Sequence, residues 1–143
     1  MEALDLSKRP PRSPREMLPG LDLLMIARTV DKLRATLPGG NLGIYKIPGF
    51  SERVLKGLGI DEGELRDVVA RAAGDAEVAA WIAARVAPER FAEINAAISS
   101  RTVASRLEDA EWMHNNPVAK TLSPETPLID FLIVDDRAAF PGA

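Results

Sequence analysis

The sequence of 143 residues has no cysteine and only one histidine, His114. The absence of cysteine excludes disulfides, zinc–thiolate sites and thiol nucleophiles. Glu111 and His114 have the spacing of half a di-iron carboxylate motif on a helix, but such a site needs a second pair with its own histidine. We therefore expect no metal ion and no cofactor, and only a site completed by a second copy of the chain stays open.

Long apolar runs are also missing. The longest, Val78–Ala84, has seven residues and is mostly alanine, whereas a membrane-spanning helix needs about 20. The first sixteen residues hold no apolar stretch of the kind found in secretory signal peptides. We expect a soluble, cytoplasmic protein with no membrane partner.

The common catalytic signatures are absent too: there is no P-loop, G-x-G-x-x-G, G-x-S-x-G or H-E-x-x-H. These absences favour a protein that is not an enzyme. Aromatic residues make up 5% of the chain and the pI is about 5.2. We do not expect nucleic acid as a partner, because stacking platforms are few and the balance of charge is acidic.

Charge is distributed unevenly, although the net charge is only −3. Residues 1–60 hold ten basic and six acidic side chains, a balance of +4, and residues 61–143 hold eight and fifteen, a balance of −7. This asymmetry predicts either a molecule with one basic and one acidic side or two halves that neutralise each other when they fold together.

Helical periodicity runs through most of the chain. From Leu21 to Leu37, apolar residues recur at the spacing of one helix face, and Pro38 and two glycines end the pattern. Capping residues and prolines mark five more helices, expected over 52–58, from 61, over 76–86, from 88 and over 103–114. Ser51 is expected to cap the first of these and Gly59 to end it. The sequence therefore predicts an all-α, compact bundle of about six or seven helices.

Two segments are ambiguous. Residues 41–50 are expected to form a loop that could hold a short strand, because Gly43, Pro48 and Gly49 interrupt the apolar pattern. Residues 128–134 fit either a helical face or a strand.

Prolines define an N-terminal arm. Pro10, Pro11, Pro14 and Pro19 bar a long helix or a central strand. We therefore divide the chain into a Pro/Arg-rich arm, residues 1–20, packed on a single helical domain, residues 21–143.

The arm carries the first candidate binding residues, Arg9, Arg12 and Arg15. In a polyproline II helix these three share one edge, each roughly 9 Å from the next. Alternatively, Ser13–Glu16 form a capping box that starts one helical turn, whose free N–H groups face an anion. Both geometries favour a negatively charged partner. The competing interpretation is that the arm's arginines pair with the acidic second half of the chain.

A second candidate group lies on the first long helix. Arg28, Asp31 and Lys32 share a helix face, because they are spaced by three and four residues. If the arm folds back along this helix, its cations and these would merge, and Asp31 would orient a cation against a ligand. The alternative is a solvated polar face.

Four stretches, RPPRSPRE, ARTVDKLRA, LGIY and LGID, occur in this order along the chain. Their order and spacing resemble a bacterial family known only as domain of unknown function 5069, and the resemblance covers most of the chain. It implies a shared fold and no chemistry, because the family has no established activity. Tyr45 stands at a matched position and completes the candidate ligand-binding set: Arg9, Arg12, Arg15, Arg28, Asp31, Lys32 and Tyr45.

The leading hypothesis for function is a non-catalytic module that binds an anionic small molecule or protein partner. The alternative is a structural or oligomerisation domain without a ligand, which would form a homo-oligomer. An enzyme with a site that matches no known motif is the third interpretation. A pocket that holds Asp31, Tyr45 or His114 together with shifted pKa values would support it.

Overall fold

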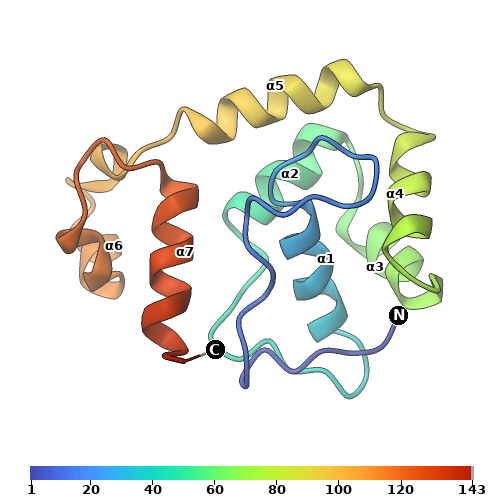
Figure 1. Ribbon diagram of the computed structural model, residues 1–143, viewed down its shortest axis with the longest axis horizontal. Helices are drawn as coiled ribbons and strands as arrows, with labels where there is room; N and C mark the ends of the chain where they lie inside the picture. The colour runs from blue at the N-terminus through green and yellow to red at the C-terminus, as the bar shows by residue number, and fades with distance from the viewer. Residues whose placement is uncertain (143) are drawn as a thin grey trace.

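Helix α1 (Ile26–Ala35) lies at the centre of the computed structural model, which describes residues 1–142 (Figure 1). Nine of the ten residues of α1 are buried. They include Arg28, Asp31 and Lys32 as well as the apolar residues that join the main core. The alternative of a solvated polar face is therefore wrong, because the N-terminal segment and α7 contact this side of the helix.

Six further α-helices and two short 3₁₀ helices complete the fold. They are α2 (Phe50–Leu58), α3 (Glu62–Arg71), α4 (Asp75–Ala83), α5 (Pro88–Ser99), η1 (Val103–Arg106), α6 (Ala110–Asn115), η2 (Pro117–Thr121) and α7 (Leu128–Ala139). Residues 1–142 contain no strand, only two isolated bridges. The predicted all-α fold with six or seven helices is confirmed, and residues 128–134 are helical. None of the helices in this part of the chain has the length and apolar character that a membrane crossing requires.

Three helix boundaries follow from local chemistry, as predicted. The Asp61 carboxylate accepts a hydrogen bond from the Glu64 backbone N–H (3.2 Å), just before α3 begins. Pro88 is the first residue of α5, where its fixed φ suits a helix and its missing N–H has no partner to lose. Gly59 ends α2 with a φ of 69°, which a residue without Cβ adopts freely.

The helix expected over 76–86 ends earlier, at Ala83. Two other predicted helices differ more from their expected bounds, because tertiary contacts override the local pattern. The helix expected from Leu21 begins only at Ile26, since the Leu24 N–H donates to the side chain of Asn95 (2.9 Å). The helix expected over 103–114 is split into η1 and α6. Its first residue, Val103, donates its N–H to a carbonyl of the segment that precedes α7, and α6 restarts after a new cap.

Two capping predictions are also wrong. Ser51 lies inside α2 and is buried, where its hydroxyl accepts a hydrogen bond from the hydroxyl of Thr29 (3.0 Å). Ser13–Glu16 form a turn and not a helix: the Ser13 hydroxyl accepts from the Arg15 N–H (3.2 Å), but no helical turns follow.

Residues 1–25 contain no helix and run beside α1 and then between α1 and α7 (Figure 1). Backbone hydrogen bonds hold them in place. The Leu6 N–H donates to the Asn41 carbonyl (2.7 Å), the Asn41 N–H donates to the Leu4 carbonyl (2.9 Å), and the Met25 N–H donates to the Pro14 carbonyl (2.8 Å). The segment thereby covers a helix whose polar side would otherwise be open.

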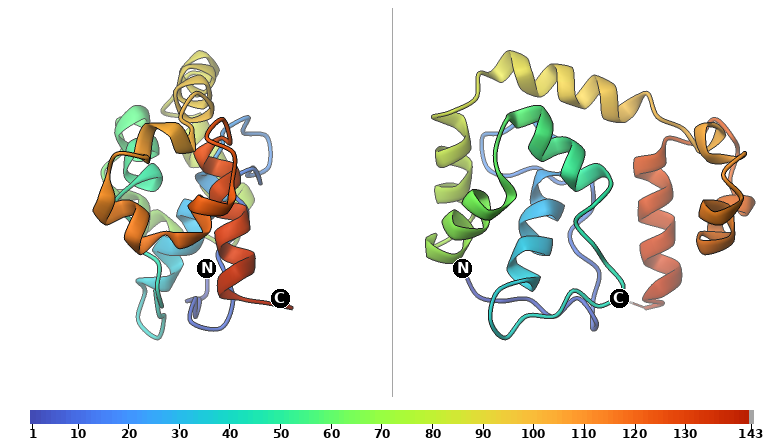
Figure 2. Two further views of the ribbon diagram at one scale, coloured as in Figure 1. Left: turned by 90° about the vertical axis from the view of Figure 1, so that its left-hand side faces the viewer. Right: turned by 180° about the vertical axis from the view of Figure 1, so that it is seen from behind.

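The hydrophobic interior consists of two main clusters, a large one around α1 and a smaller one beside α7, and of a minor third cluster of Leu4, Leu6 and Ala35. The smaller cluster contains Val103, Ala119, Leu128 and Phe131. Helix α5 runs across the top of the molecule and links α4 to this second part (Figures 1 and 2). Phe50, at the start of α2, packs against both main clusters. Any cavity between the part of the molecule around α1 and the part around α7 therefore has one wall from each of these two parts.

Candidate functional site

A buried ion pair connects the centre of the molecule with its last helix. The Arg28 guanidinium, 2% exposed, donates two hydrogen bonds to the Asp136 carboxylate (2.7 and 3.0 Å) and a third to the Arg12 carbonyl (3.2 Å). The Tyr45 hydroxyl donates to the same carboxylate (2.8 Å), and the Arg28 guanidinium lies 5.4 Å from the centre of the Tyr45 ring. These contacts hold α1, α7 and the 41–49 segment together.

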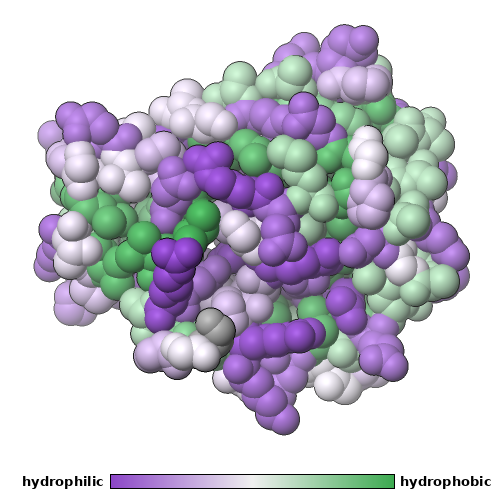
Figure 3. All heavy atoms as spheres, viewed as in Figure 1, coloured by the Kyte–Doolittle hydropathy of each residue, from purple (hydrophilic) through white to green (hydrophobic). Residues whose placement is uncertain are grey.

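Two arginines of the N-terminal segment also contact carboxylates of the chain itself. The Arg12 guanidinium bridges Asp31 on α1 (3.0 Å) and Asp75 at the start of α4 (2.7 Å). The Arg15 guanidinium pairs with Asp130 on α7 (2.8 Å) and holds the pKa of that carboxyl below its ordinary value. Hydrophilic side chains spread across the middle of the face that Figure 3 shows, which is the face seen in Figure 1. A ligand-binding role for these arginines stays a prediction.

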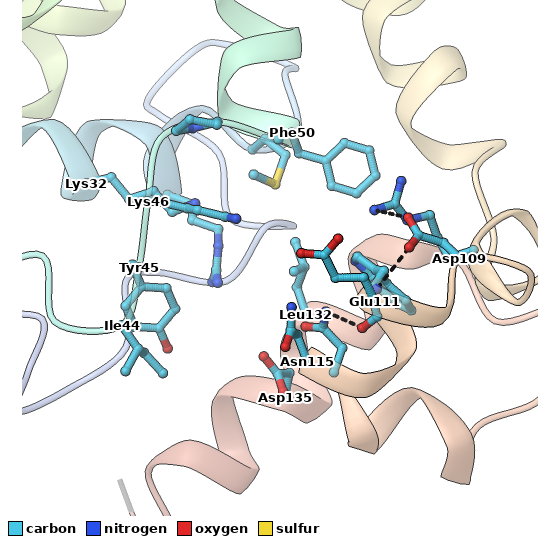
Figure 4. Close-up of a pocket in the computed structure, with 17 residues that line it drawn as sticks. Lys32, Ile44, Tyr45, Lys46, Phe50, Asp109, Glu111, Asn115, Leu132 and Asp135 are labelled. Atoms are coloured by element: carbon cyan, nitrogen blue, oxygen red, sulfur yellow. Dashed lines mark hydrogen bonds and ion pairs between the residues drawn. The ribbon is translucent and has the colours of Figure 1, made fainter.

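A pocket of about 630 Å³ lies beside this network. One wall comes from α1 and the segment that leads into α2, and the opposite wall comes from η1, α6 and α7 (Figure 4). The residues that line it are Met25, Arg28, Lys32, Ile44, Tyr45, Lys46, Pro48, Gly49, Phe50, Arg106, Asp109, Glu111, Trp112, Asn115, Asn116, Leu132 and Asp135.

The two walls carry different charges. Lys32 and Lys46 lie on the α1 side, and Glu111 and Asp135 lie on the α6–α7 side (Figure 4). Asp109 belongs to the second wall too, but its carboxylate caps α6 and lies 3.4 Å from the guanidinium of Arg106. The pocket therefore offers cationic groups on one side and acidic groups on the other.

The floor and rim of the pocket add apolar and amide groups. Phe50 and Leu132 contribute apolar surface, and the Trp112 ring packs against the ring of Phe131 with 5.2 Å between centroids. Asn115 contributes a side-chain amide at the end of α6. Sites for small molecules combine apolar surface with placed polar groups, and this pocket is at the polar end of that range, because seven of its lining side chains are charged.

Lys32 is the most unusual residue of the pocket. Its side chain is 8% exposed, yet among residues 1–142 no carboxylate lies within 4 Å of its ammonium and no hydrogen bond from it is present. Burial, and then the nearby charge of Arg28, lower the pKa of Lys32 to about 8. Much of its charge is thus uncompensated by the protein itself.

Two other groups at the pocket also have shifted pKa values. Burial, and then the charge of Asp136, raise the pKa of Asp135. Burial and the hydrogen bond to Asp136 raise the pKa of Tyr45, so that its hydroxyl stays protonated as a donor. Burial and the neighbouring carboxylate thus favour the protonated form of Asp135.

The pocket brings together three of the seven residues predicted to bind a ligand. Arg28, Lys32 and Tyr45 line it, whereas Arg9, Arg12, Arg15 and Asp31 do not. Sequence analysis missed Lys46 and Phe50 as pocket residues. The only local signal for Lys46 was its place directly after the matched stretch LGIY.

The half motif of Glu111 and His114 does not converge on one site. Glu111 lines the pocket, whereas His114 is exposed and does not. Within residues 1–142, no group of three or more potential metal ligands comes together.

A family model described as a domain of unknown function (DUF5069) matches residues 8–137. This range includes every residue that lines the pocket. No curated protein matches the chain.

Proposed function

The chain belongs to the DUF5069 family, a domain of unknown function, and we propose that its pocket binds a small anionic molecule held by Lys32 and Lys46. One observation carries the proposal: Lys32 is buried with a positive charge that no carboxylate of residues 1–142 contacts. Burial of an unpaired charge is costly, and a bound anion would supply the missing partner.

Lys46 supports the same role from the neighbouring segment. It is exposed at the pocket, and no ion pair involves it among the described residues. Two ammonium groups on one wall suit a carboxylate or phosphate group better than either does alone, because both contacts are charge-assisted. Lys32 and Lys46 therefore fix the end of the pocket where the anionic group binds.

The remaining walls define the rest of the ligand. A volume of about 630 Å³ lies in the range of small-molecule sites and admits a compound of metabolite size. Phe50 and Trp112 contact its apolar part, and Glu111 and Asp135 accept hydrogen bonds from hydroxyl or amino groups at its far end. The ligand class is thus a small carboxylate or phosphate ester with polar substituents.

Thermal unfolding in the presence of inorganic phosphate and of malonate, at constant ionic strength, tests the proposal. A ligand that binds only the folded state raises the melting temperature, and at a concentration of 100 times Kd it adds about 2.7 kcal/mol. We expect an increase for the wild type, a much smaller one for Lys46→Ala, and the wild-type increase for the control Lys56→Ala. Lys56 is an exposed lysine on α2 that pairs with Glu52 (2.8 Å).

Two results would reject an anion site in this pocket. One is a melting temperature that neither anion changes. The other is an increase of the same size in the wild type and in Lys46→Ala, which would place the bound anion elsewhere.

A further inference from the structure

We propose that Lys32 acts as a nucleophilic amine and forms an imine with the carbonyl group of an anionic aldehyde or ketone in the pocket. The inference rests on the proposed anion site for the position of the ligand, but the reactivity of Lys32 is a property of its own surroundings. It assigns the chain an activity toward one chemical class, small 2-oxo acids and other anionic carbonyl compounds.

The geometry separates Lys32 from an ordinary salt-bridged lysine. Its side chain is 8% exposed and opens on the pocket, so a bound carbonyl group can reach it while bulk water is largely excluded. Within residues 1–142 it has neither an ion-pair partner nor a hydrogen-bond acceptor. Nothing in the protein therefore holds the amine in its protonated form by direct contact.

The charges around Lys32 act in the same direction. Arg28 lies one helical turn earlier on α1, Lys46 faces it from the adjacent segment, and both disfavour a third positive charge. The charge of Asp136 on α7 favours the ammonium, but this carboxylate already accepts hydrogen bonds from Arg28 and Tyr45. The other carboxyl group of this part of α7, Asp135, has a raised pKa that reduces its negative charge near neutral pH.

These surroundings increase the fraction of neutral amine. With a pKa of about 8, roughly 10% of Lys32 is unprotonated at pH 7, compared with about 0.03% for a lysine with the ordinary value of 10.5. Burial of an amine next to other cations is a known way to activate a lysine for attack on carbonyl compounds. Lys32 thus has both the access and the protonation state that the reaction needs.

The reaction requires no oxidant or reductant. The Lys32 Nζ lone pair attacks the carbonyl carbon, a C–N bond forms, and the carbonyl oxygen takes up a proton. The resulting carbinolamine then loses its hydroxyl group as water, and the imine forms with release of the second amine proton. Asp135 lines the same pocket, and its raised pKa suits it to deliver the proton to the leaving hydroxyl.

Lys46 has a different task in this scheme. It holds the carboxylate of the carbonyl compound, so that the carbonyl carbon faces Lys32. We therefore expect Lys46 to determine the concentration of an anionic aldehyde that half-saturates the reaction, and Lys32 to determine whether the adduct forms at all.

Reductive trapping tests the inference directly. The protein is incubated with glyoxylate and sodium cyanoborohydride, and peptide mapping by mass spectrometry locates the reduced adducts. We expect Lys32 to be modified at least tenfold faster than the other lysines, Lys8, Lys46, Lys56 and Lys120, and the N-terminal amine is scored separately. The rate at Lys32 should rise with pH and level off above about pH 8, in line with its pKa.

Three variants complete the test. Lys32→Arg keeps the positive charge and should lose the fast adduct, and its circular dichroism reports whether it folds. Lys46→Ala should raise the half-saturating glyoxylate concentration by a larger factor than it lowers the maximal rate, and Lys56→Ala should behave as the wild type. Equal labelling of all lysines, or labelling of the N-terminal amine alone, would overturn the inference.

A neutral aldehyde separates the two proposals. Acetaldehyde lacks the anionic group, so Lys46→Ala should slow its labelling of Lys32 far less than it slows labelling by glyoxylate. If Lys46-dependent phosphate binding is observed and Lys32 remains unlabelled by either aldehyde, the nucleophile is refuted and the anion site stands. Fast labelling of Lys32 by acetaldehyde without phosphate binding would refute the anion site and keep the nucleophile.

Discussion

Lys32 lowers the stability of the protein at neutral pH. In the unfolded chain its pKa has the ordinary value of 10.5, and in the folded protein it is about 8. Between these two values the unfolded state binds more protons than the folded state, so the free energy of unfolding rises with pH in this interval. Below pH 8 the full cost of the buried charge is present, and above pH 10.5 it is absent.

We predict that Lys32→Met stabilises the protein. The free energy of unfolding at pH 7 should increase by about 1–3 kcal/mol, because the substitution removes the buried charge and keeps the apolar volume of the side chain. The gain over the wild type should shrink as the pH rises from 8 to 10.5. Urea unfolding at several pH values measures it, with Lys56→Met as a control that stays within about 0.5 kcal/mol of the wild type. A Lys32→Met variant less stable than the wild type at pH 7 would contradict the burial argument.

Arg12 and Arg15 provide a matched comparison of two ion pairs from one segment. Arg12 is 26% exposed and bridges Asp31 and Asp75, whereas Arg15 is 50% exposed and pairs with Asp130 alone. Loss of Arg12 leaves the buried Asp31 carboxylate with only the more distant Arg34 guanidinium (3.8 Å), whereas loss of Arg15 leaves an Asp130 carboxylate that water can solvate.

At the scale of elements, this difference predicts how firmly the N-terminal segment is attached. Arg12→Ala should lower the free energy of unfolding by about 2–4 kcal/mol, because it removes the side-chain bridge from the segment to both α1 and α4. Arg15→Ala should lower it by less than about 1 kcal/mol. Denaturant unfolding of the two variants measures both values, and equal losses would show that the Asp31–Arg12–Asp75 bridge has no special weight.

The elements that sequence analysis predicted well are those with a local cause. Asp61 and Pro88 specify the starts of α3 and α5 through contacts within a few residues, so a pattern of neighbours suffices. The start of α1 was missed because the chain before Ile26 bonds to partners far away in sequence, among them Asn95. Periodicity over 21–37 cannot register such a contact.

In the candidate site, too, the residues with a local signal were predicted and those placed by contacts far away in sequence were not. Arg28, Lys32 and Tyr45 were singled out by their spacing on one helix or by the family resemblance, and the pocket contains all three. Its other wall comes from residues 106–135, whose place opposite α1 depends on the path of α5 and on the buried pair of Arg28 with Asp136. Pairing across more than a hundred residues leaves no local signal in a single sequence.

For the whole molecule, the two main hydrophobic clusters predict uneven local stability. Helix α6 has no buried residue and belongs to the smaller cluster only through partly buried side chains such as Trp112. Nine of ten residues are buried in α1. Local opening is easiest where few apolar contacts must be broken.

We therefore predict faster amide hydrogen exchange in α6 than in α1. A compound that spans the pocket, with an anionic group at Lys46 and a hydroxyl group at Glu111, should slow exchange in α6, because opening of the helix would break its contact with that wall. Helix α3 lines no part of the pocket and serves as the internal control. Exchange in α6 that is as slow as in α1, or unchanged by a pocket-spanning compound that raises the melting temperature, would contradict this prediction.

The position of the two indole rings has an optical consequence. Trp112 lines the pocket, with the Arg106 guanidinium 5.2 Å from its ring centre, whereas Trp81 lies on α4 under Arg85, outside the pocket lining. An occupant changes the polarity around one fluorophore and leaves the other as it was. With Trp81→Phe, the emission spectrum of the unlabelled protein reports on pocket occupancy alone, and stopped-flow mixing then resolves how fast a molecule enters.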